Sequence, residues 1–106
     1  MPYVILALDQ PDAQALREAL KPAHLDYLSE RQERMLAGGA VLDEDGRAIG
    51  ALIIVDADDR ADAERFIGDD PFAQGGLFAS VRVMPWRQAF FDRRRAPASP
   101  GHRRPE

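Results

Sequence analysis

Cysteine is absent from this chain of 106 residues, and histidine is rare, with two copies. The absence of cysteine excludes disulfides, thiolate metal sites and cysteine nucleophiles, and is typical of proteins from a reducing compartment. His24 is the one histidine outside the C-terminal stretch, so a zinc site is not expected. Phosphate-binding glycine loops and serine nucleophile elbows are also missing. We therefore expect no metal and no cofactor.

The sequence also has no long apolar run and no excess of positive charge. No stretch reaches the roughly 20 apolar residues that span a bilayer, and no signal-peptide pattern precedes the first apolar run. The formal net charge of -4 argues against nucleic-acid binding. We expect a cytoplasmic protein whose partners are neither membranes nor nucleic acids.

The length suits one domain, and 45% hydrophobic residues are enough to build its core. The composition changes at Arg93, where an arginine run is followed by proline, alanine, serine and glycine. Such a segment has little to bury. We assign residues 1–92 to the domain and residues 93–106 to a disordered arginine-rich tail.

Hydrophobic periodicity and turn residues predict strands and helices in the order β-α-β-β-α-β, with the first helical segment broken in two. That order is typical of an α+β, ferredoxin-like subunit with a four-stranded antiparallel sheet. The predicted elements are a strand at 3–8, a helix from an Asp12 cap to about Ala19, a helix from Pro22 to about Leu36 stopped by Gly38-Gly39, a hairpin of strands 40–42 and 49–55 turning at Gly46, a helix capped by Asp58 or Asp59 and ending at Gly68, a loop at 69–72, and a strand from Leu77 to Trp86.

The first and third strands, central in such a sheet, are apolar on both faces. Residues 3–8 and 51–55 have apolar side chains at odd and even positions alike. Helices cover one face, and strands that are apolar on both faces need a cover for the other. If this face were left bare, the exposed apolar patch would be about as large as the largest patch found on monomeric proteins. The pattern therefore predicts a homodimer formed through the sheet face.

His24 and Asp70 are the candidate catalytic residues. Asp70 precedes a proline, which holds it on non-helical backbone. An aspartate that accepts a hydrogen bond from one imidazole nitrogen leaves the other nitrogen to move a proton. The alternatives are a partly buried His24 bonded to backbone, and an Asp70 that only turns the chain.

Arg17 lies seven residues before His24, about two helical turns. We expect it to hold a carboxylate or phenolate oxygen of a ligand at the same site. The alternative is a surface ion pair with Asp12 or Glu18, which contributes little to stability.

Taken in order, these residues resemble the YciI-like (YCII-related) family over nearly all of residues 1–91. The shared positions are Tyr3-Val4-Ile5, Arg17, His24-Leu25-Asp26-Tyr27-Leu28, Gly38-Gly39, Gly46, Gly50, Asp70-Pro71-Phe72, Gly76-Leu77-Phe78, Val83, Pro85-Trp86 and Phe90.

The resemblance implies a dimeric α+β barrel and an active site whose histidine and aspartate map to His24 and Asp70. We assign Arg17 and Phe72 to the binding of a small-molecule substrate. The expected function is proton transfer of the lyase or isomerase type on a small metabolite. The alternative is a non-catalytic ligand-binding or accessory dimerisation domain. Ala51 stands where relatives often carry a serine, so a reaction shared with them does not follow.

Overall fold

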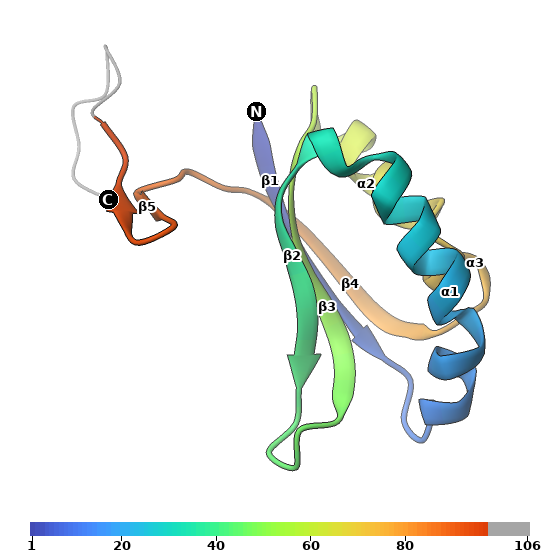
Figure 1. Ribbon diagram of the computed structural model, residues 1–106. Helices are drawn as coiled ribbons and strands as arrows, with labels where there is room; N and C mark the ends of the chain where they lie inside the picture. Colours follow the sequence, from blue (N-terminus) through green and yellow to red (C-terminus); the bar gives the residue numbers. More distant parts are fainter. Residues whose placement is uncertain (98–106) are drawn as a thin grey trace.

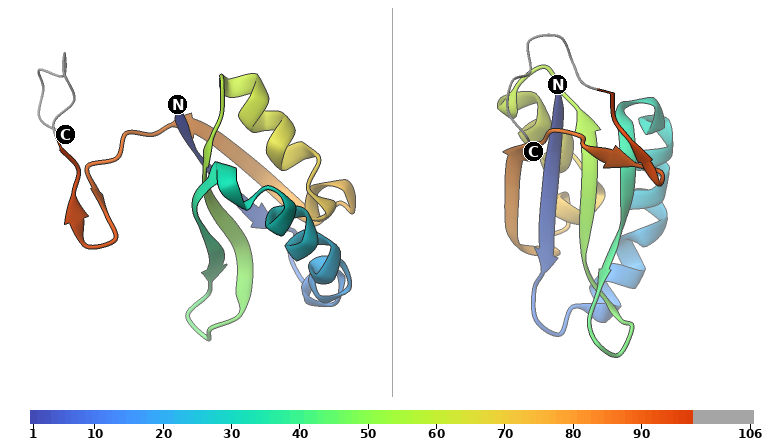
Figure 2. Two further views of the ribbon diagram at one scale, coloured as in Figure 1. Left: turned by 45° about the horizontal axis from the view of Figure 1, so that its top comes forward. Right: turned by 90° about the vertical axis from the view of Figure 1, so that its left-hand side faces the viewer.

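A computed structural model describes residues 1–97 of the chain. Its main sheet is antiparallel and has the strand order β2-β3-β1-β4, which Figure 2 shows side by side in its right-hand view. The helices lie together on one face of this sheet (Figure 1). The chain has the predicted α+β ferredoxin-like fold. The four strands are β1 (Pro2–Asp9), β2 (Met35–Leu42), β3 (Ala48–Asp56) and β4 (Phe78–Pro85).

The core lies between the sheet and the helices. Side chains alternate along β1, so that Tyr3, Ile5 and Ala7 are buried on the helical side. Across the register, Ile53 and Val55 of β3 extend this layer. The opposite face of the central strands is also apolar, as the sequence indicated.

The helical layer consists of α1, α2 and α3, and it corrects the prediction that Pro22 breaks the first helix. Pro22 lies inside a continuous α1, although an interior proline costs about 3 kcal/mol because it cannot donate to the carbonyl four residues earlier. Arg17 and His24 are buried on either side of Pro22, and we attribute the continuity of the helix to these two anchors. The helices are α1 (Gln14–Glu30), a 3-10 turn η1 (Gln32–Arg34), α2 (Arg60–Gly68) and α3 (Pro71–Gln74).

Asp12 was also wrongly predicted as a cap. It has φ +55°, a left-handed conformation that aspartate tolerates, and the N-cap residue is Ala13, which makes no side-chain capping bond. Asp59 does cap α2, accepting from the Asp62 N–H at 2.8 Å, and Gly46 turns the β2–β3 hairpin with φ +86°.

The end of α1 differs from the prediction as well. The helix ends at Glu30, so that Leu36 and the Gly38-Gly39 pair belong to β2 instead of a helix and its stop. The two glycines are paired with β3 across the sheet. Long-range pairing along the whole of β2 therefore overrides the helical spacing of the leucines.

The last described segment leaves the domain. β5 (Phe90–Phe91) and β6 (Arg94–Arg95) form a separate two-stranded ribbon, which projects from the side of the sheet opposite the helices (Figure 1). Arg94 and Arg95 fall in the predicted tail, whose residues 98–106 lie outside the described part of the chain. Within residues 1–97, no helix has the length and apolar composition needed to cross a membrane.

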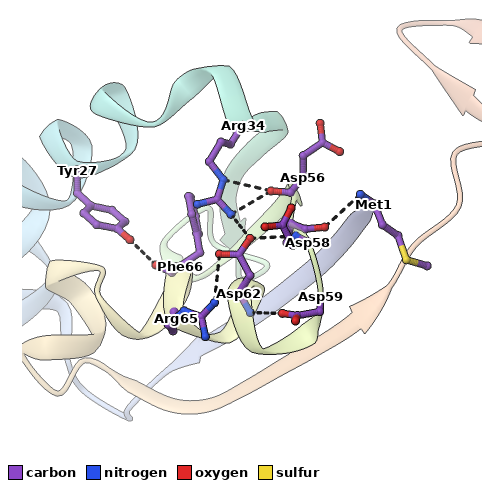
Figure 3. A network of polar contacts seen from close by, with 10 residues as sticks. Met1, Tyr27, Arg34, Asp56, Asp58, Asp59, Asp62, Arg65 and Phe66 are labelled. Carbon is purple, nitrogen blue, oxygen red and sulfur yellow. Dashed lines mark hydrogen bonds and ion pairs between the residues drawn. The ribbon is translucent and has the colours of Figure 1, made fainter.

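Asp62 joins η1 to the start of α2 (Figure 3). Its Oδ2 accepts from Arg34 Nη2 at 2.9 Å and from the Asp58 N–H at 3.0 Å, while Arg34 also donates to the Asp56 carbonyl. The Asp58 hydrogen bond, followed by the charge of Arg34, lowers the pKa of Asp62 below its ordinary value of 3.8, and partial burial opposes this. The ionised carboxylate thus stabilises the fold.

We expect Asp62→Asn to lower the urea midpoint of unfolding at neutral pH. A depressed pKa contributes stability above about pH 3.8 and loses it as the pH falls through the folded-state pKa. The difference between variant and wild type should therefore shrink in strong acid. Glu44→Gln, at an exposed hairpin position, is the matched control, and a pH-independent Asp62→Asn effect would contradict the assignment.

Candidate functional site

The most buried side chains of α1 are polar. Arg17 and His24 are 6% and 7% exposed, while Leu16 and Leu25 on the same helix are 38% and 49% exposed. An apolar stripe usually faces the core, so buried polar residues are the informative exception. They mark the face of α1 on which a site is built.

Asp70 meets His24 from the short helix α3. Its two carboxylate oxygens lie 2.8 and 2.9 Å from His24 Nδ1. Asp70 is fully buried, and it has the extended backbone expected before Pro71, with φ -64° and ψ 134°. Its Oδ1 also accepts from the Phe72 N–H at 2.8 Å and so caps α3. The structure therefore places the two predicted residues in contact, with a helix cap where a loop was expected.

Phe72 supports the imidazole through its ring face. The two rings are stacked, with centroids 3.8 Å apart and planes 10° apart, and Phe78 packs edge-on against Phe72. Stacking on one side and the carboxylate at Nδ1 together fix the orientation of the His24 ring.

This arrangement selects one tautomer of the neutral imidazole. A carboxylate accepts, so Nδ1 carries the proton and Nε2 carries the lone pair. Nε2 has no hydrogen-bond partner within residues 1–97, and it is not among the buried atoms that lack one, so it reaches solvent. The His24 ring is thereby oriented, with Nδ1 toward Asp70 and Nε2 as its accessible nitrogen.

Arg17 lies against the same phenyl ring. Its Cζ is 4.8 Å from the Phe72 ring centroid, and its Nη2 donates to the Gly50 carbonyl at 2.7 Å. Its ion-pair partner is Asp9, with Nε 3.4 Å from Oδ2. The alternative of a surface pair with Asp12 or Glu18 is therefore wrong, because Arg17 turns inward.

Two residues of this constellation were not found from the sequence. Asp9 follows the first apolar run and indicates only the end of a strand, although its buried side chain meets Arg17 of α1. The sequence indicated Gly50 only as one of the positions shared with the family, without a role at the site. A side chain there would bring its Cβ within 2.4 Å of the Ala7 carbonyl oxygen, so the position requires glycine. Ala51, next to it, is buried and presents a methyl group.

Burial raises the pKa of the Asp9 carboxyl above its ordinary value, and the charge of Arg17 acts in the opposite direction. Within residues 1–97 no group of three or more potential metal-ligating side chains is gathered. Asp70 is fully buried, whereas His24 keeps 7% of its surface exposed. A recess lies around Met1, Arg34 and Asp62, and neither His24 nor Asp70 lines it.

The fold and this buried polar cluster define a ferredoxin-like α+β domain with one histidine held by an aspartate. The model of the YCII-related domain matches residues 1–87, and the chain belongs to this family. Two curated relatives are 31% identical over 98 residues, covering 85% of this chain and 100% of their own length: an uncharacterized protein of Haemophilus influenzae and protein YciI of Escherichia coli O6:H1.

Among solved structures, the chain is similar to 5-chloro-2-hydroxyhydroquinone dehydrochlorinase (TftG) of Burkholderia phenoliruptrix AC1100 in complex with 2,5-dihydroxybenzoquinone. The TM-score is 0.77 and the identity 29%, over 83% of this chain and 95% of that one. A protein of Agrobacterium tumefaciens, 15% identical with TM-score 0.51 over 86% of this chain and 96% of that one, shares the fold.

We expect Asp70→Asn to disturb the tautomer of His24. The amide oxygen introduced by this change can still accept from the Phe72 N–H, so the cap is retained, but the amide nitrogen can donate to Nδ1 and favour the other tautomer. ¹⁵N NMR of the imidazole should show an unprotonated Nε2 in the wild type and a mixture of tautomers in the variant. The exposed Asp69→Asn is the control, and an unchanged Asp70→Asn spectrum would show that the carboxylate does not hold the ring.

Proposed function

We propose that this protein is a small-molecule enzyme of the lyase or isomerase type, in which His24 moves a proton on a hydroxylated ring or a similar metabolite. Asp70 orients the imidazole through Nδ1, and Nε2 takes the proton from a ligand carbon or hydroxyl. The observation that carries the proposal is the buried clamp on Nδ1 beside an accessible Nε2.

The remaining groups bind the ligand. Arg17 Nη1 has no partner within residues 1–97 and is not sealed from solvent. It donates to a ligand oxygen, while Phe72 supports both Arg17 and His24. The similarity to a dehydrochlorinase of a hydroxylated hydroquinone supports chemistry on electron-rich rings. In such an elimination the base removes a proton, the electron pair forms a double bond, and the leaving group departs.

The proposed assembly is a homodimer packed through the bare face of the sheet. Leu8 and Leu52 on this face are 37% and 39% exposed, and Val4, Leu6 and Ile54 beside them are half-buried. The helices occupy the other face (Figure 1). A second copy is the self-complementary cover for such a surface. Residence in the cytoplasm stays a prediction from composition.

To test the chemistry, we would follow chloride release from 5-chloro-2-hydroxyhydroquinone and deuterium exchange into the ring hydrogens of hydroxyhydroquinone. His24→Asn keeps an N–H donor toward Asp70 but removes Nε2. We expect it to lower the rate of any turnover by about 10²–10⁴-fold, the contribution typical of a positioned proton carrier. His102→Asn is the matched control.

Turnover that survives at the wild-type rate in His24→Asn would end the assignment of His24. Binding of these compounds without turnover or exchange in the wild type would favour the alternative, a non-catalytic ligand-binding domain.

The dimer predicts that Leu52→Glu shifts the protein to monomer in sedimentation velocity at micromolar concentration, because the burial of a carboxylate in the interface is unfavourable. Leu16→Glu changes a side chain of nearly equal exposure, 38%, on the outer side of α1 and should leave the dimer intact. If the wild-type protein sediments as a monomer at this concentration, the proposed homodimer is wrong.

A further inference from the structure

Asp9 carries a buried carboxylate that makes no hydrogen bond within residues 1–97. Its side chain is 6% exposed, and both of its oxygens lie buried without a partner. Arg17 Nε lies 3.4 Å from Oδ2, yet the two atoms do not form a hydrogen bond, and Nε is also without a partner. A buried charge of this kind is unfavourable unless a nearby charge compensates it. The interaction of Asp9 with Arg17 is therefore mainly one of charge.

The Arg17 guanidinium is fixed on three sides. Nη2 is bound to the Gly50 carbonyl, the plane lies near the Phe72 ring, and Nε faces Asp9. This leaves Nη1 to meet a ligand. The Asp9 carboxylate faces Nε of this guanidinium, so it is placed to offset part of the positive charge that a ligand at Nη1 would meet.

The formal charges of the site sum to minus one when the imidazole is neutral. Arg17 contributes +1, Asp9 and Asp70 contribute -1 each, and His24 contributes 0. Charges interact strongly at sites shielded from water. An anionic oxygen at Nη1 would meet the repulsion of Asp9 close behind the guanidinium, whereas a neutral hydroxyl or carbonyl oxygen would not.

We propose that Asp9 is a positioning residue that sets the charge preference of the site, so that Arg17 Nη1 donates to a neutral hydroxyl or carbonyl oxygen and anionic groups are disfavoured. This inference rests on the proposed function in placing the ligand at Arg17. It replaces the carboxylate or phenolate oxygen that the sequence led us to expect at Arg17 with an uncharged hydroxyl or carbonyl oxygen.

The test compares two ring compounds that differ in one group, neutral hydroquinone and anionic 4-hydroxybenzoate. Dissociation constants are measured at neutral pH by NMR titration of the wild type and of Asp9→Asn, a change of nearly equal shape that removes the charge. We expect hydroquinone to bind the wild type more tightly than 4-hydroxybenzoate. In Asp9→Asn, 4-hydroxybenzoate should gain about tenfold in affinity and hydroquinone should change by less than about twofold.

Two further variants identify the path of the effect. Asp12→Asn removes an exposed carboxylate three residues further along the chain and should change neither constant. In the double variant Asp9→Asn with Arg17→Gln, the gain for 4-hydroxybenzoate should disappear because the cation is missing. Loss of both ligands to the same extent in Asp9→Asn is what a purely structural role would give, and it would overturn the proposal.

The proposal is also overturned if Asp9→Asn does not gain affinity for the anion, or if the gain persists without Arg17. If Asp9→Asn does not fold, the wild type decides, since a preference for 4-hydroxybenzoate over hydroquinone would contradict it. Failure of the proposed function is distinguishable. If hydroquinone binds more tightly than 4-hydroxybenzoate but no His24-dependent exchange is observed, the proposed enzymatic function is wrong. The proposed charge preference of the site would still hold.

Discussion

The contact between the Asp70 carboxylate and the His24 ring is the interaction on which the site depends. Asp70 has no access to water, so its charge needs hydrogen bonds from the protein. It receives one from the Phe72 N–H and one from His24 Nδ1. The first forms α3, and the second joins α3 to α1. A single carboxylate thus organises local structure, helix packing and the orientation of the imidazole.

The domain is held together by two kinds of contact, an apolar core and a set of buried polar side chains. The sheet and α2 supply a conventional apolar core around Ile5, Ile53 and Phe66. By contrast, α1 buries Arg17 and His24 against its neighbours and leaves two of its leucines, Leu16 and Leu25, exposed. Residues that break the ordinary rule of burial are expected where function is carried. The polar face of α1 is accordingly the part of the fold that the rest of the scaffold positions.

The sequence predicted the sheet well because alternation is read directly from apolar residues. It offered His24 and Asp70 as a candidate pair because histidine is rare here and Pro71 fixes the backbone before it, and the family resemblance pointed to the same two residues. It did not predict a continuous α1, because Pro22 disfavours a helix locally and the tertiary packing of α1 cannot be read from the sequence. Asp9 was missed since its importance arises from a cation brought in by another element, which composition and spacing do not reveal.

The shared use of Asp70 has a thermodynamic consequence. Opening of α3 would release the imidazole at the same moment, because the cap and the ring are held by one group. A molecule that binds better to the oriented ring must then also protect the backbone amides of α3 from hydrogen exchange, by an amount set by its own binding free energy. Occupancy of this site would therefore be measurable as slower hydrogen exchange of the α3 amides.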